Sequence, residues 1–123
     1  DSSKIPEQIE AAFKNGSAAK LLLVKGKTDY IASDSNILET VNEPDVPTLE
    51  AIGGTGDTIT GLVSAFVYAG LEPKEAAIVA SKTNRMAGKF AQPTPATKVA
   101  QIIDHFPAVF EKYLCEWSEV CYK

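Results

Sequence analysis

Gly53-Gly54-Thr55-Gly56-Asp57-Thr58 is the stretch from which the rest of the sequence is best interpreted. Three glycines, an acid and a following amphipathic run are typical of a loop that turns directly into a helix. Glycine lets backbone N–H groups converge because it carries no Cβ. A helix N-terminus adds unsatisfied N–H donors and a partial positive charge. The stretch therefore predicts a binding site for a phosphate or another oxyanion.

Asp57 is unexpected at such a site, because a carboxylate repels an anion. Two interpretations remain open from the residues alone. The side chain belongs to the cap region of the helix, or it is a catalytic base placed beside the bound anion.

The chain that follows the glycine stretch predicts helices. A buried stripe has the spacing i, i+3, i+4, i+7, i+8 and ends at Gly70. Its members are Ile59, Leu62, Val63, Phe66 and Val67. Pro73 opens a second helix to about Lys89, because proline is favoured in a first turn. Two further helices are predicted, at 96–105 and from Pro107 onward.

The chain that precedes the glycine stretch predicts a short helix and then strands. Pro6 begins a helix that runs to Lys14. The apolar run 20–24 is typical of a strand buried on both faces, as in a parallel sheet. Residues 28–32 and 37–41 predict a hairpin around a polar turn, and 42–48 predict an irregular loop.

Five helices beside three strands predict an incomplete α/β fold, because a doubly wound sheet normally has more parallel strands. The length of 123 residues predicts a single domain, 1–123. We expect the sheet to be completed by self-association, by a partner chain, or by an N-terminal half that this sequence does not contain.

Composition excludes several classes of protein. A net charge of −4 argues against nucleic-acid and acidic-membrane partners. No apolar stretch approaches the roughly 18 residues that cross a bilayer, and the first residues lack a signal-peptide pattern. Cys115 and Cys121 are expected to be free thiols, and a lone His105 predicts no metal cluster. A cytoplasmic protein is the expectation.

Three features in order resemble the C-terminal half of the ribokinase-like superfamily, and most closely its NAD(P)H-hydrate dehydratase branch. They are Leu-Val-Lys-Gly-Lys-Thr at 23–28, Gly-Gly-Thr-Gly-Asp-Thr-Ile-Thr-Gly at 53–61, and the helix-to-helix turn at 69–77. The resemblance covers 20–106, and its middle feature is the most specific.

The resemblance implies a partial ribokinase-like fold and a set of site residues. Asp57 would be the general base on a substrate hydroxyl, and Gly54, Thr55 and Gly56 would form the anion hole. The resemblance also implies two ligands: ATP or ADP, with or without Mg²⁺, and a small-molecule substrate. Since Lys25 follows a buried strand, we expect it to neutralise nucleotide phosphate, and Asn84 to line the adenine side.

The sequence also departs from the family. The family fold is more than twice as long, and Pro47-Thr48-Leu49 stands where members carry an Asn-Pro segment. Asn84 stands where a histidine is often seen.

Three functions therefore stay open. The first is a nucleotide-dependent dehydratase of NAD(P)H hydrate, and the second is a small-molecule kinase acting on a sugar or a vitamin precursor. The third is a non-catalytic nucleotide-binding or assembly module.

Overall fold

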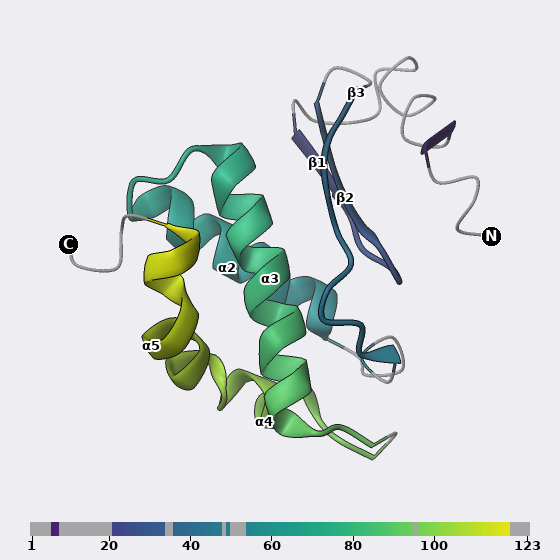
Figure 1. Cartoon of the computed structure of the whole chain (residues 1–123), viewed down its shortest axis with the longest axis vertical. Helices are drawn as coiled ribbons and strands as arrows, with labels where there is room; N and C mark the ends of the chain where they lie inside the picture. Colours follow the sequence, from purple (N-terminus) through teal and green to yellow (C-terminus); the bar gives the residue numbers. More distant parts are fainter. Residues whose placement is uncertain are drawn as a thin grey trace. The chain divides into compact units, whose positions relative to one another are not determined.

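A computed structural model describes residues 6–7, 21–33, 36–47, 49, 54–94 and 96–118, with the side chains of residues 22, 55 and 56 left aside (Figure 1). The chain divides into two compact units, Asp1–Asn42 and Glu43–Lys123, and each is described by itself. The single domain 1–123 stays a prediction. Of the helix predicted at 6–14, Pro6 and Glu7 are helical, and the other residues lie outside the described part.

The first unit contains a three-stranded antiparallel sheet in the order β1-β2-β3. Its strands are β1 (Leu21–Val24), β2 (Asp29–Ser33) and β3 (Asn36–Val41), with a register shift between Ile31 and Ala32. The predicted hairpin is confirmed. The parallel, fully buried strand predicted at 20–24 is wrong. Only four residues join β1 to β2, and so short a connection permits an antiparallel neighbour but no crossover.

Burial in the sheet is concentrated on the middle strand. Ile31 and Ala32 are completely buried, and Asp29 is almost so. The carboxylate of Asp29 accepts a hydrogen bond of 3.0 Å from the Gly26 N–H, which closes the turn between β1 and β2. Along β3, residues 36–40 are exposed. β3 is at the edge of the described sheet, and of its residues only Val41 is buried.

The second unit is helical, and its first helix is α2 (Thr55–Tyr68). Ile59, Leu62 and Phe66 are buried as predicted, but Val67 is 42% exposed. The predicted stripe was one residue too wide, because the packed face follows i, i+3 and i+7 and leaves Val67 at its margin. Gly70, at φ 113°, follows the end of the helix as predicted.

α3 (Pro73–Ala91) lies at the centre of this unit and packs against α2, α4 and α5 (Figure 1). Pro73 stands in its first turn as predicted. Small buried residues, among them Ala76, Ala80 and Ala87, let the neighbouring helices approach closely.

Two shorter helices complete the unit, α4 (Val99–Ile103) and α5 (Phe106–Trp117). The helix predicted from Ala96 begins three residues later than expected. The hydroxyl of Thr97 accepts from the Thr94 N–H (2.9 Å), and the hydroxyl of Thr94 accepts from the Ala96 N–H (3.2 Å). These side-chain bonds hold a turn in place of a first helical turn.

Aromatic rings join α5 to its neighbours. Phe110 meets Phe66 edge to face, with 5.9 Å between ring centroids, and Tyr113 lies 6.3 Å from Phe90. His105 lies at the N-terminal end of α5, 6.4 Å from the Phe90 ring. Such pairs add to the apolar burial that fixes α5 along α3.

The expectation of free thiols is wrong for Cys115, which is disulfide-bonded. Cys115 is an exposed residue in the last turn of α5. Cys121 lies outside the described residues. None of the helices in the described part combines the length and apolar character of a membrane-spanning segment.

Candidate functional site

The glycine stretch forms the start of α2. Gly54 is the residue before the helix, with φ 93° and ψ −7°, in the left-handed region that glycine adopts without strain. A Cβ at this position would also lie 3.2 Å from Cγ1 of Val99, the first residue of α4. The backbone conformation therefore favours glycine here, and a Cβ would also force the Val99 side chain to shift slightly.

The hydrogen bonds of α2 begin after the glycine loop. The Thr58 N–H donates to the Gly54 carbonyl over 3.0 Å, and the Thr58 hydroxyl donates to the same oxygen over 2.9 Å. The amides of Gly54, Thr55, Gly56 and Asp57 precede this first helical bond. They are the donors that a helix start leaves available to an anion.

Asp57 is an exposed residue of the first turn of α2. The cap residue of the helix is Gly54, and it carries no side-chain cap bond. Within the described part of the chain, no hydrogen bond or ion pair holds the Asp57 carboxylate. A carboxylate that stands in the first turn without such a partner is free to accept a proton from a bound hydroxyl.

Lys25 follows β1 in the first unit, directly before the turn that Asp29 closes at Gly26. It is half-buried and has a partner within the structure. The glycine loop belongs to the second unit, so the predicted meeting of Lys25 with the anion site stays a prediction.

Asn84 lies inside the second unit rather than on a rim. Its side chain is completely buried on α3, and neither its Nδ2 nor its Oδ1 has a hydrogen-bond partner. The Oγ1 of the neighbouring Thr83 is in the same condition. Buried polar groups are normally paired, so the unpartnered amide of Asn84 is a candidate for contact with a ligand.

Arg85 was not singled out by the sequence. It is 5% exposed, and its Nη1 donates to the carbonyl of Pro44 over 3.3 Å, so it ties the loop before the glycine stretch to α3. Its signal in the sequence was weak, because an arginine on a helix is usually a solvated residue. Among the described residues, no three His, Cys, Asp or Glu side chains gather as a set of metal ligands.

Comparison with known proteins identifies the family. The family model described as NAD(P)H-hydrate dehydratase, of the carbohydrate kinase type, matches residues 8–107. The chain belongs to this family. The resemblance inferred from the three sequence features is therefore confirmed, and the mixture of helices with a small sheet agrees with part of an α/β domain of this family.

Three curated proteins are similar to this chain at 35–37% identity. An uncharacterized protein of Methanocaldococcus jannaschii is 35% identical over 93% of this chain and 49% of its own length. A bifunctional NAD(P)H-hydrate repair enzyme of Pyrobaculum aerophilum is 35% identical over 78% of this chain and 19% of its own. An ADP-dependent (S)-NAD(P)H-hydrate dehydratase of Nitrosopumilus maritimus is 37% identical over 58% of this chain and 24% of its own length.

The chain thus spans about half the length of the Methanocaldococcus relative, and the aligned part is a smaller share of the other two. No solved structure matches it.

Proposed function

We propose that this chain carries the nucleotide-binding and proton-accepting side of an ADP- or ATP-dependent NAD(P)H-hydrate dehydratase. The observation that carries the proposal is the left-handed Gly54 at the start of α2, followed by an exposed Asp57 in the first turn. Family membership and a relative whose name includes ADP dependence support the choice of ligand.

The loop fits an anionic group on its own chemistry. Its donors are main-chain N–H groups at a helix N-terminus, where the helix dipole favours negative charge. Gly54 has no Cβ, so a phosphate can approach the backbone closely. We assign the phosphate contacts to Gly54, Thr55 and Gly56, with Lys25 as a further cation.

Asp57 is the general base of the proposed mechanism. A hydroxyl is a poor leaving group, and a bound nucleotide supplies a phosphoryl group that turns it into a good one. Asp57 accepts the hydroxyl proton while the hydroxyl oxygen bonds to phosphorus and the bond from phosphorus to the nucleotide breaks. The backbone amides at 54–56 stabilise the charge that develops on the phosphoryl oxygens. Loss of phosphate, together with a proton from the neighbouring ring carbon, then forms the double bond and completes the dehydration.

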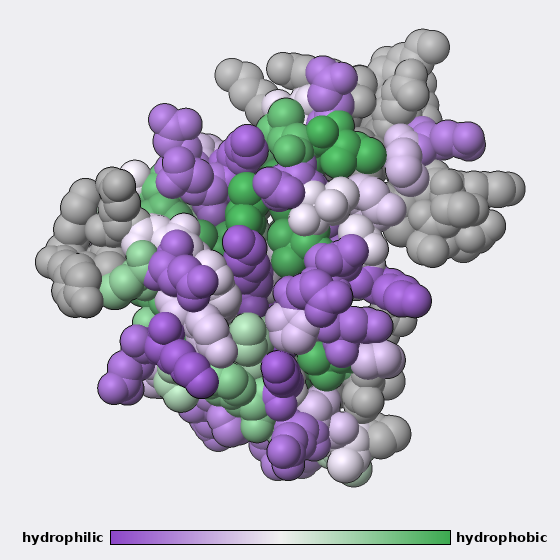
Figure 2. Space-filling view, in the orientation of Figure 1, coloured by the Kyte–Doolittle hydropathy of each residue, from purple (hydrophilic) through white to green (hydrophobic). Residues whose placement is uncertain are grey.

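We propose further that β3 is where the sheet is completed. In the described residues its outer edge pairs with no strand, and Ile37 and Leu38 are 40% and 39% exposed. An edge strand with apolar side chains is a natural template for another strand. On the face of the molecule shown in Figure 2, hydrophobic areas are interspersed among hydrophilic side chains. A second copy of this chain or a partner chain would supply the missing strand.

The test is an assay of the chain with NADH hydrate and ADP or ATP, in parallel with Asp57→Asn. We expect NADH to be regenerated by the unaltered chain. Asp57→Asn should abolish turnover but keep the stabilisation by ADP, because a neutral side chain no longer opposes the anion. Phosphorylation of an alcohol without dehydration would point to a kinase. Stabilisation by nucleotide without turnover, even with partner chains present, would point to a binding module.

A further inference from the structure

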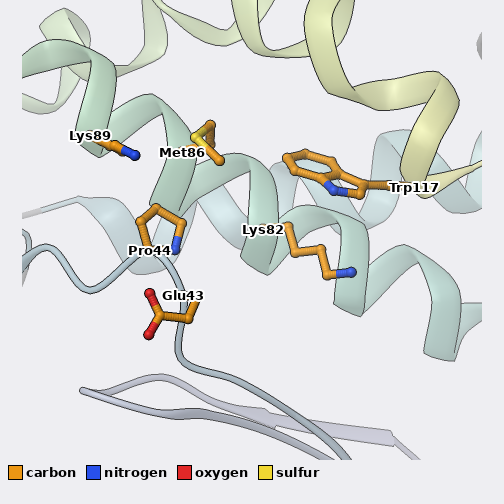
Figure 3. A pocket seen from close by; sticks show the side chains of 6 residues that line it. All are labelled: Glu43, Pro44, Lys82, Met86, Lys89 and Trp117. Carbon is orange, nitrogen blue, oxygen red and sulfur yellow. The ribbon is translucent and has the colours of Figure 1, made fainter.

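A hollow lies beside α3, and residues outside the glycine loop line it. It is a groove of about 290 Å³ within the second unit (Figure 3). The residues that line it are Glu43, Pro44, Lys82, Met86, Lys89 and Trp117. None of residues 54–57 is among them, so the groove is not part of the anion site at the start of α2.

One wall of the groove is a face of α3. Lys82, Met86 and Lys89 follow one another at spacings of four and three residues, which places them on one side of the helix. The two lysines begin about 10 Å apart along the helix axis, at a rise of about 1.5 Å per residue. Met86 lies between the two lysines along the helix and lines the same groove, and thioethers contact aromatic rings favourably.

The second wall is the indole of Trp117, at the C-terminal end of α5. The ring stacks in parallel on Tyr113, with 5.2 Å between centroids and 9° between planes. The Nζ of Lys82 lies 6.0 Å from the centroid of the Trp117 ring. This arrangement holds the half-buried indole in place and keeps an ammonium group beside it.

The third wall is the segment Glu43-Pro44. The buried guanidinium of Arg85 donates to the Pro44 carbonyl and so fixes this segment against α3. Glu43 is exposed at the rim, where its carboxylate accepts hydrogen bonds but donates none.

The charges in the groove are opposite in sign to those of the protein as a whole. Two lysines face one glutamate, whereas the chain carries a formal charge of −4. A local positive site on an acidic protein attracts anions specifically to that site. The groove thus combines the flat indole of Trp117 with two cations, Lys82 and Lys89, and one hydrogen-bond acceptor, Glu43.

We propose that this groove binds a mononucleotide, that is, a heteroaromatic ring with an amino group and a phosphate. The ring lies against Trp117 and Met86, the phosphate meets Lys82 and Lys89, and the ring amino group donates to Glu43. Each part of the ligand is complementary to one of the groups that line the groove. The proposal goes beyond the dehydratase function and assigns the chain a second ligand site.

The experiment uses Trp117 as its own reporter, since it is the single tryptophan of the sequence. Its fluorescence is followed during titration with AMP, adenosine and inorganic phosphate, with excitation at the red edge of indole absorption. We expect AMP to quench the emission saturably. Adenosine and phosphate should each bind at least about tenfold more weakly, because each lacks one half of the recognition.

Lys82→Gln and Lys89→Gln should each weaken AMP binding by about fivefold or more, the range of a lost charge-assisted hydrogen bond. Lys112→Gln is the matched control. The Nζ of Lys112 lies 5.5 Å from the Tyr113 ring, on the same aromatic cluster, yet Lys112 does not line the groove. Circular dichroism of each variant checks that the helices are retained.

Gly54→Val separates this proposal from the dehydratase proposal. It should remove nucleotide binding at the helix start and leave the quenching of Trp117 by AMP unchanged. The groove proposal is overturned if AMP leaves the emission unaltered, or if phosphate alone quenches as well as AMP. It is overturned equally if the quenching depends on Gly54 but not on Lys82 or Lys89. Quenching by AMP without any stabilisation by ADP would contradict the dehydratase proposal alone.

Discussion

Gly88 of α3 lies directly against the side chain of Leu49. A Cβ built at Gly88 would come within 2.7 Å of both methyl carbons of Leu49. Leu49 is 4% exposed, and it precedes the glycine loop along the chain. The absence of a side chain at Gly88 therefore lets Leu49 pack onto α3.

Gly88→Ala should destabilise the protein by about 1–3 kcal/mol, because overpacking a filled core forces its neighbours to shift. The better helix propensity of alanine, about 1 kcal/mol, offsets only part of that cost. Urea denaturation measures the free energy of unfolding. Gly61→Ala is the control, because a Cβ there meets nothing within 4 Å and Gly61 is exposed on α2. Gly61→Ala should be neutral or stabilising, and equal effects of the two changes would contradict the packing argument.

Gly54→Ala should destabilise the protein by about 1–2 kcal/mol through its left-handed backbone alone, and contact with Val99 adds to this. It should also abolish the rise in melting temperature that ADP gives the unaltered chain, because the amides at the helix start are displaced. Gly70→Ala is the matched control, with φ 113° but open space around its Cβ. It should share the backbone strain and keep the ADP effect. Loss of that effect in both variants would show that strain, not the anion site, is responsible.

Asn84→Leu replaces a buried amide without partners by an apolar side chain of similar size. We expect it to raise the free energy of unfolding by about 1–2 kcal/mol, since the desolvation cost of the amide disappears. If Asn84 contacts nucleotide, the same change lowers the stabilisation by ADP. Thr83→Val is the comparison, because its Oγ1 is also orphaned but has no predicted role in binding. An unchanged ADP effect in Asn84→Leu would remove Asn84 from the binding site.

Ile37→Lys and Leu38→Lys should reduce self-association or partner binding through β3, because charges on an edge strand oppose pairing with another strand. Light scattering of the chain and of each variant measures the mass in solution. Lys74→Glu, on the exposed surface of α3, is the control. A monomeric unaltered chain that is equally monomeric in both variants would contradict pairing between copies.

Much of the helical unit could be predicted from local patterns. Gly70 and Pro73 mark the end of one helix and the start of the next, since the first adopts a positive φ and the second has its φ preset. The hairpin of β2 and β3 followed likewise from alternating side chains and a polar turn. These features depend on residues close together in the sequence.

The predictions were wrong where the structure depends on strand pairing or on side-chain bonds rather than on local sequence pattern. The apolar run at 20–24 predicted a parallel strand, and this was wrong. Hydrophobicity does not specify strand direction, whereas the length of the connection from β1 to β2 does. The start of α4 moved because the hydroxyls of Thr94 and Thr97 bind nearby backbone groups. The spacing of the cysteines alone did not give the bonded state of Cys115.

By itself, then, the sequence determined that a glycine-rich loop opens a helix and that Asp57 stands in its first turn. Both follow from the conformational freedom of glycine and the periodicity of the residues after it. Only the tertiary structure decided that Gly54 abuts Val99, that Asn84 is buried without partners, and that Lys82, Lys89 and Trp117 share a groove. These are contacts between separate elements, and they depend on how helices pack rather than on how each one forms.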